Sequence, residues 1–313
     1  MRSVSGTSRL AAAPVEIQPR HRNGIGQLAT LALFLLPAAI VYTLFVLVPI
    51  VQAVYYSFFK WNGLGGAPTN FVGLANFSQV LKDATFRGAF SHNMIILVLS
   101  IATQLPFAFA LALLVRGGLR GRVVFRTIFF LPYVLSDVIT GVMWNFIYKP
   151  SGGLLNSLLT IIPGFKPIGF LGDPHTVLTA LFLVMTWKYF GLHLLLFLAA
   201  LQNVPKEVEE AAAIDGASYW QTILWVVLPL MGDTARLSIY LSALGSIQIF
   251  DLVWVMTTGG PVNASDTMAT YMYKFGFQRF SIGYGSAVAL IIFAACLILS
   301  LIYQRLSRQQ EIA

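Results

Sequence analysis

Six long apolar stretches divide the chain, and shorter polar segments separate them. A bilayer core of about 30 Å requires roughly 20 apolar residues in a helix, and each stretch meets this length. The pattern predicts an all-α integral membrane protein, a six-span helical bundle with spans at about 29–58, 93–115, 123–148, 176–201, 233–257 and 283–303. We expect residues 1–28 to form a polar leader, residues 29–303 the transmembrane domain and residues 304–313 a tail.

The basic residues are distributed unevenly about these spans. With the amino terminus inside, twelve lie at the cytoplasmic ends of spans, seven lie at the external ends, and Lys188 falls within a span. The positive-inside rule therefore predicts that both termini are cytoplasmic. The external loops at 61–76, 149–174 and 257–280 are rich in Gly, Pro, Asn and aromatic residues, so they either lie at the interface or meet an external partner.

Composition narrows the class of protein further. Of the 313 residues, 57% are hydrophobic and 10% are charged, whereas a soluble domain has about 45–50% apolar and about 25% charged residues. The net charge of +8 is not gathered into basic tracts with interleaved aromatic residues, so we expect no nucleic-acid partner. The single cysteine, Cys296, excludes an internal disulfide and a cysteine-based metal site.

Three ionisable residues fall within the predicted spans: Asp137, Lys188 and Asp251. Inserting a charged side chain at the centre of a membrane-spanning helix costs about 2.5–3.5 kcal/mol of free energy. Each of the three should therefore face the bundle interior and contact a partner. Either Lys188 forms a buried structural pair with one of the acids, or these residues contact a substrate, and both can hold. The lysine would also suit an anionic substrate.

Polar and aromatic residues at helical spacing accompany these charges. Sugars are bound by planar hydrogen-bonding side chains and by aromatic rings, although ordinary packing is the alternative for each aromatic residue. The candidates for a substrate path are Asp137, Trp144, Asn145, Trp187, Lys188, Tyr189, Gly191, Gln248 and Asp251. His193 has no His or Cys at ligand spacing, so we expect no metal site, and no catalytic set of nucleophile, base and orienting residue is visible.

One predicted cytoplasmic loop, residues 202–232, is much longer than the others. Pro205 suits the start of a helix, and Gly216 can end it in a left-handed conformation. A second helix is expected over about 217–227 and should stop at Pro229. Such a pair of helices, with a small Ala-rich face beside acidic residues, suits docking into a groove of another subunit. The alternative is a hairpin that lies on the membrane.

The same loop carries a long motif. Glu210-Ala211-Ala212 is followed after three residues by Gly216, and after nine more by Val226-x-Leu228-Pro229. This pattern resembles the EAA loop of bacterial binding-protein-dependent ABC importers, EAA-x3-G-x9-I-x-LP, with Val226 where Ile is usual. Phe250-Asp251 and the segment from Thr257 to Pro261 extend the match. Across nearly its whole length, the chain resembles the carbohydrate-uptake permeases of the maltose type.

The resemblance implies a permease subunit that moves a sugar or sugar-like solute across the bacterial cytoplasmic (inner) membrane by alternating access. In that family the EAA loop forms the coupling helix that seats on the ATP-binding subunit. The residues implied to carry coupling are Glu210, Ala211, Ala212, Asp215 and Gly216. The implied partners are a second homologous permease chain in a heterodimer, two ATP-binding subunits and an extracytoplasmic solute-binding protein.

ATP and Mg are expected on the partner subunits, and no cofactor is expected in this chain. The chain has no Gly-x4-Gly-Lys-Ser/Thr motif, so it is not predicted to be the ATPase or another enzyme. Two other classes remain open from the residues alone. An ion-coupled secondary transporter could use Asp137 and Asp251, although it would leave the EAA pattern unexplained. An intramembrane enzyme could use the same residues as a catalytic carboxylate pair.

Overall fold

The computed structural model describes residues 24–117 and 121–308. Most of the predicted leader and the end of the predicted tail lie outside these residues. Within them, four helices are long and apolar enough to cross a membrane, and the number rises to six if each of two pairs of helices bent at a break forms one span. The all-helical membrane fold predicted from the apolar stretches is confirmed. The chain divides into two units, residues 1–51 and 52–313, which are described separately.

The described part of the first unit, from residue 24, is a single apolar helix. It consists of α1 (Gly24–Tyr42), the π segment η1 (Thr43–Leu47) and the beginning of α2 (Val48–Ser57). The candidate span runs over Leu31–Ser57, and the described side chains from Leu31 to Pro49 are all exposed. Because these side chains are apolar, lipid or another protein surface must cover them in the membrane.

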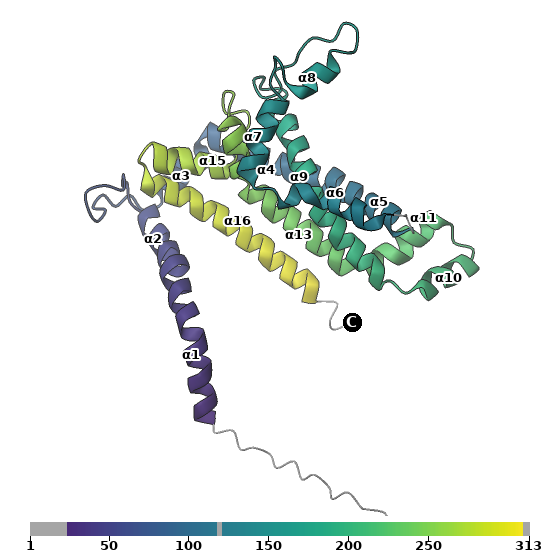
Figure 1. Cartoon of the computed structure of the whole chain (residues 1–313). Helices are drawn as coiled ribbons and strands as arrows, with labels where there is room; N and C mark the ends of the chain where they lie inside the picture. Colours follow the sequence, from purple (N-terminus) through teal and green to yellow (C-terminus); the bar gives the residue numbers. More distant parts are fainter. Residues whose placement is uncertain (1–23, 118–120, 309–313) are drawn as a thin grey trace, which may run out of the picture. The chain divides into compact units, whose positions relative to one another are not determined.

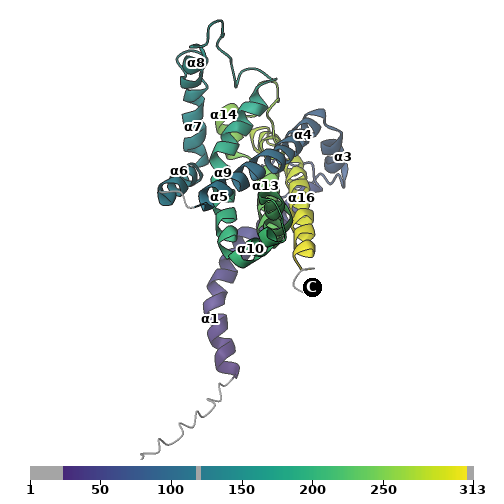
Figure 2. The same cartoon turned by 90° about the vertical axis from the view of Figure 1, so that its right-hand side faces the viewer.

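The second unit contains the remaining helices, most of which Figure 1 labels. They are α3 (Ala75–Lys82), α4 (Ala84–Leu99), η2 (Ser100–Gln104), α5 (Leu105–Arg116), α6 (Arg122–Val134), α7 (Asp137–Ile147), α8 (Leu154–Leu159), α9 (Val177–Asn203), α10 (Lys206–Ile214), α11 (Tyr219–Thr222), η3 (Ile223–Val227), α12 (Leu228–Leu230), α13 (Gly232–Gln248), α14 (Asp251–Thr257), α15 (Met268–Tyr273), η4 (Lys274–Gln278) and α16 (Ile282–Arg308). α9 packs against α5 and α6, and α13 packs against α16. Figures 1 and 2 show α7 and α8 toward one end of this unit and α10 toward the other.

Three helices continue through a proline because a π turn comes directly before it. η1, η2 and η3 each end two residues before a proline, at Pro49, Pro106 and Pro229. Proline lacks an N–H group and its ring clashes with the carbonyl four residues earlier, whereas a π turn bonds to the carbonyl five residues earlier. The N–H of Leu228 accordingly donates to the carbonyl of Ile223. The predicted end of the loop's second helix at Pro229 is confirmed to within one residue, because the helix ends at Leu230 and a 76° bend separates it from α13.

The third predicted span is not a single helix. α6 and α7 meet at a 98° bend, and Ser136 caps α7 by accepting a hydrogen bond from the backbone N–H of Ile139. The fifth predicted span is likewise divided into α13 and α14. Asp137 and Asp251, which the sequence placed well inside spans, therefore each lie in the first turn of a helix. An acidic side chain is favourable there because it complements the positive end of the helix dipole.

Side chains from other helices satisfy the backbone where α13 ends. Asn93 on α4 is fully buried, and its Nδ2 donates to the carbonyls of Ser246 (2.6 Å) and Ile247 (3.3 Å). Its Oδ1 accepts from the N–H of Met268 at the start of α15 (2.8 Å). One amide side chain therefore joins α4, α13 and α15. It gives their backbone groups hydrogen-bond partners that apolar side chains could not provide.

A buried ion pair holds the segment between α14 and α15. Asp266 is fully buried and pairs with Lys274 Nζ at 2.7 Å, while the hydroxyl of Thr270 donates to the same carboxylate at 3.0 Å. His92 on α4 lies 2.8 Å from the carbonyl of Asp266 through its Nδ1. Burial raises the pKa of the Asp266 carboxyl, although the Lys274 ammonium acts in the opposite direction.

We predict that Asn93→Ala destabilises the folded chain by about 3 kcal/mol or more, because three buried backbone groups lose their partner. The measurement is the thermal unfolding temperature of the detergent-solubilised protein. Asn203→Ala is the matched control, since Asn203 is exposed at the end of α9. Equal unfolding temperatures for the two variants would contradict the assigned role of Asn93.

Candidate coupling loop and substrate path

The start of α10 is stabilised by the order of its residues. Pro205 directly precedes the helix, and Glu207 and Glu209 lie in its first turn, where acids are favourable. Pro205 occupies the capping position, one residue earlier than the sequence predicted. The side chain of Arg116, at the end of α5, pairs with Glu209 at 2.6 Å. This ion pair connects α10 to the membrane-crossing helices.

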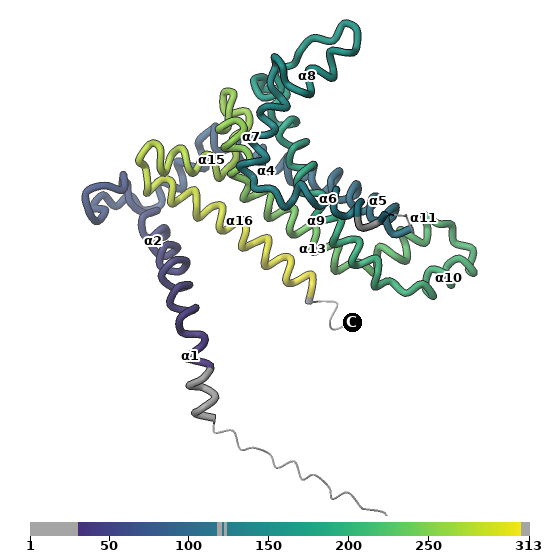
Figure 3. The backbone as a smooth tube through the Cα atoms, in the orientation of Figure 1, coloured from purple at the N-terminus to yellow at the C-terminus, as the bar shows by residue number. Residues whose placement is uncertain are grey.

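The end of α10 explains the glycine of the motif. Gly216 has φ +84°, a left-handed conformation that glycine adopts without steric cost. Its N–H donates to the carbonyl of Ala213 (3.1 Å), and the N–H of Ala217 donates to that of Ala212 (3.0 Å). These are the two hydrogen bonds of a Schellman motif. The predicted left-handed helix end is confirmed, and Figure 3 shows the backbone turning there toward α11.

α10 has almost no packing within this chain. No residue of the helix is buried, and Glu210, Ala211 and Asp215 are exposed while Ala212 is half-buried. Ile214, the last residue of the helix, is 86% exposed. A cavity of about 340 Å³ separates part of α10 from the end of α5 and the start of α11, and Glu210 lines it. The five residues of the motif are therefore accessible to another protein.

Lys188 bonds to both sides of the break between α6 and α7. Its side chain is 3% exposed, and its Nζ lies 3.1 Å from Asp137 Oδ1. The same Nζ donates to the carbonyl of Leu135, which the break leaves without a helical partner. The hydroxyl of Tyr189 donates to Asp137 at 2.9 Å. The structural pair considered from the sequence is present, and its acid is Asp137 rather than Asp251.

Two predicted path residues on α7 make packing contacts within this chain. The Nδ2 of Asn145 donates to the carbonyl of Val255 on α14 (3.1 Å), and a side chain at the neighbouring Gly141 would collide with Val255. Trp144 packs against Trp187 on α9, with ring centroids 5.5 Å apart. In this structure Asn145 and Trp144 therefore contact α14 and α9.

Gly191 also has a packing role. The residue is buried on α9, and a Cβ atom at this position would meet the backbone carbonyl of Phe129 on α6. Gly191 therefore permits close contact between two helices, and it does not present a surface to a substrate. Gln248 and Asp251 differ, because both are exposed beside the break between α13 and α14. Gln248 contacts Cys296 Sγ at 3.4 Å.

A cavity of about 160 Å³ lies between α9, α13 and the helix formed by α4 and η2. Tyr189 is the one predicted path residue among those that line it. Other polar residues on its wall were missed from the sequence: Ser100, Gln104, His193, Ser242 and Ser246. The signal was available, since three pairs are spaced four residues apart and so share helix faces: 100 and 104, 189 and 193, 242 and 246.

Three side-chain atoms beside this cavity have no partner among the described residues: Gln104 Nε2, His193 Nδ1 and Ser242 Oγ. Buried polar groups are normally hydrogen-bonded to protein or water, so a polar occupant is expected here. The described residues contain no group of three His, Cys, Asp or Glu side chains that could hold a metal ion.

Membrane-crossing helices with central breaks, a polar cavity among them and an exposed helix on a long loop define a membrane transport permease. The chain belongs to the family described as the binding-protein-dependent transport system inner membrane component, whose model matches residues 104–311. It is the permease subunit of a binding-protein-dependent ABC transporter, a multi-pass inner membrane protein and not itself an ATPase. The interpretations as a secondary transporter and as an intramembrane enzyme are thereby set aside.

Known proteins are similar over almost the full chain. A probable ABC transporter permease protein of Pyrococcus horikoshii is 34% identical over 87% of this chain and 93% of its own length. The diacetylchitobiose uptake system permease protein NgcF of Streptomyces coelicolor is 30% identical over 90% of this chain and 83% of its own length. A solved bacterial ABC transporter involved in the import of the acidic polysaccharide alginate shares the fold, with a TM-score of 0.80, 23% identity and coverage of 91% and 97%.

We predict that Lys188→Met lowers the stability of the chain by about 3–5 kcal/mol, because removing one partner of a buried pair leaves Asp137 without its cation. Adding Asp137→Leu to this variant should recover part of the loss. Thermal unfolding in detergent measures both effects. Asp233→Ala is the control, since this acid is 84% exposed and surface pairs contribute about 0–1 kcal/mol. A Lys188→Met protein as stable as this control would exclude a structural role for the pair.

Proposed function

We propose that this chain translocates a sugar or sugar-like solute by alternating access, driven by two ATP-binding subunits on its cytoplasmic side. It pairs with a second, homologous permease chain and receives substrate from an extracytoplasmic solute-binding protein. Both termini are cytoplasmic. The observation that carries the proposal is α10, an exposed helix that bears the EAA motif and is tied to α5 by a single ion pair.

The shape of the loop supports a coupling role for Glu210, Ala211, Ala212, Asp215 and Gly216. The Schellman motif fixes the end of α10, while the small side chains of Ala211 and Ala212 permit close approach of a partner surface. The ion pair between Arg116 and Glu209 gives a displaced α10 a direct connection to α5. A rigid-body change in the membrane follows from moving one end of each connected helix.

A sugar as substrate is supported by one relative and by the residue types near the breaks. The Streptomyces relative is an uptake permease for diacetylchitobiose. In this chain, Gln248 and Asp251 offer exposed hydrogen-bonding groups, and the polar cavity offers Tyr189 and Ser246. No cofactor is proposed for this chain, because ATP and Mg belong to the ATP-binding subunits.

Glu210→Ala is expected to weaken binding of the ATP-binding subunits by about 30-fold or more, because it leaves a buried partner charge unpaired at the interface. Binding is measured with purified permease complex and ATP-binding subunits, together with ATP-dependent uptake in proteoliposomes. Glu207→Ala, an exposed acid of the same helix outside the motif, should have little effect. Unchanged binding and uptake in Glu210→Ala would refute the coupling role.

Substitutions of the predicted path residues should affect uptake and leave assembly of the complex intact. Gln248→Ala and Asp251→Asn should each lower sugar uptake by about 3- to 10-fold, the effect of losing one hydrogen bond to the solute, without loss of assembly. Gln202→Ala, an exposed glutamine at the end of α9, is the control. Substrate is chosen by screening sugars against the cognate solute-binding protein. If that protein binds no sugar or polyol, the sugar assignment fails while the coupling role stands.

A further inference from the structure

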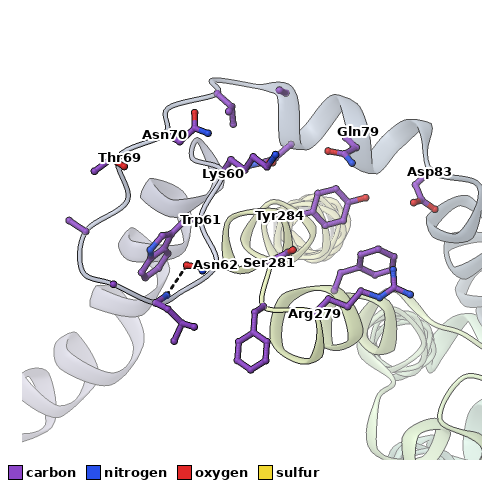
Figure 4. Close-up of a pocket in the computed structure, with 18 residues that line it drawn as sticks. Lys60, Trp61, Asn62, Thr69, Asn70, Gln79, Asp83, Arg279, Ser281 and Tyr284 are labelled. Atoms are coloured by element: carbon purple, nitrogen blue, oxygen red, sulfur yellow. Dashed lines mark hydrogen bonds between the residues drawn. The ribbon is translucent and has the colours of Figure 1, made fainter.

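One large cavity in the second unit lies outside the coupling loop and the substrate path. It measures about 910 Å³ and is formed by the segment after α2, by α3 and by the junction of η4 with α16. Figure 4 shows Lys60 and Trp61 on the loop wall, Gln79 on α3, and Arg279 and Ser281 beside the start of α16. None of these residues has a role in the proposed transport mechanism.

Backbone hydrogen bonds hold the loop wall in place. The N–H of Lys60 donates to the carbonyl of Asn70 (2.9 Å), and the N–H of Val72 donates to that of Phe58 (2.8 Å), so the loop closes on itself. The N–H of Gly283 on α16 donates to the carbonyl of Trp61 at 3.0 Å, which fastens the loop to that helix. The cavity is therefore preformed, and little conformational entropy is lost when a ligand enters it.

The wall has more hydrogen-bond donors than acceptors. The side chains of Lys60, Trp61 and Arg279 can only donate, and neither cation has an ion-pair partner among the described residues. Trp61 Nε1 is buried and also lacks a partner within the described part of the chain. The carboxylate on this wall, Asp83, already accepts from two backbone N–H groups at the start of α4. The complementary ligand is therefore rich in acceptors and negatively charged.

The position of the cavity along the chain indicates the source of that ligand. One candidate span ends at Ser57 and another begins at Ile282. Lys60 is three residues beyond the first end, which is at most about 10 Å of extended chain, and Arg279 is three residues before the second start. The headgroup layer extends about 5–8 Å beyond the hydrocarbon core on each side. Both cations therefore lie close to the ends of candidate spans, where lipid headgroups are expected.

Two exposed apolar side chains also line the cavity. Leu64 and Phe280 both line it and are 62% and 59% exposed. A water-soluble anion would leave these two side chains exposed to water, whereas the glycerol and upper acyl region of a lipid would cover them. Tryptophan is also enriched at the membrane interface, where Trp61 would lie.

We propose that this cavity binds the phosphate-bearing headgroup of an anionic phospholipid such as phosphatidylglycerol. Lys60 and Arg279 neutralise the phosphate from two walls, and Trp61 Nε1 donates to one of its oxygens. The amides of Asn70 and Gln79, which line the same cavity, hydrogen-bond the hydroxyls of the headgroup. The proposal concerns the membrane environment of the permease and does not depend on the transported solute.

The test is native mass spectrometry of the assembled transporter in detergent, titrated with phosphatidylglycerol or with phosphatidylcholine. Phosphatidylglycerol should bind more tightly than phosphatidylcholine to the unmodified protein. In the variant Lys60→Gln/Arg279→Gln its dissociation constant should rise about 30-fold, and about 5-fold for either substitution alone, since each basic residue near a membrane surface contributes about 1 kcal/mol.

The control removes the same charge elsewhere. Lys82→Gln/Lys149→Gln alters two exposed cations that do not line this cavity, and it should leave phosphatidylglycerol binding unchanged. Trp61→Phe keeps an aromatic ring at this position and removes the Nε1–H donor, so it should weaken binding by several-fold while the protein remains folded. Equal loss of lipid in the control and cavity variants would overturn the proposal.

Two further measurements distinguish other occupants. Glycerol 3-phosphate and an acidic oligosaccharide are titrated in place of lipid, and both should bind weakly because neither covers the side chains of Leu64 and Phe280. Tighter binding of either than of phosphatidylglycerol would assign the cavity to a soluble anion and contradict the proposal. The proposal would also fail if the Lys60/Arg279 variant lost affinity for the solute-binding protein and kept its affinity for lipid.

Discussion

The need to hydrogen-bond every backbone group inside an apolar membrane is the constraint on which the rest of this structure depends. A straight helix meets that need by itself, but this chain bends α6 against α7 and separates α13 from α14. Each break leaves carbonyl groups free, and buried side chains of neighbouring helices bond to them. Lys188 donates a hydrogen bond to a carbonyl at the first break, and Asn93 donates to a carbonyl at the second. Where proline would interrupt a helix, a π turn preserves the bonding instead.

The same constraint explains why residues that look functional in sequence are partly structural. Charges and amides are costly in a bilayer, so their presence suggested a substrate path. In the fold, Lys188 with Asp137, and also Asn145, bond within this chain. The exposed side chains of Gln248 and Asp251 and the cavity beside Tyr189 are the polar groups that remain for a solute.

The coupling loop shows how far local sequence rules reach. Pro205, the first-turn acids and Gly216 are local signals, and they correctly indicated the start and end of α10 because helix caps depend on neighbouring residues alone. The ion pair between Arg116 and Glu209 could not be predicted, since it joins residues 93 positions apart. Pro229 indicated the end of the second helix to within one residue, whereas no simple pattern predicted the π turn that precedes it.

By itself, the sequence determined the membrane class, the six apolar stretches and the long loop at 202–232 with its motif, because apolar length and helix caps are properties of contiguous residues. Only the tertiary structure decided where spans break, which acid pairs with Lys188 and which side of α7 is packed. It also brought Lys60 and Arg279 to one cavity from opposite ends of the chain. These features depend on contacts between distant segments. Helical periodicity indicates which residues share a face, but it does not indicate which element that face contacts.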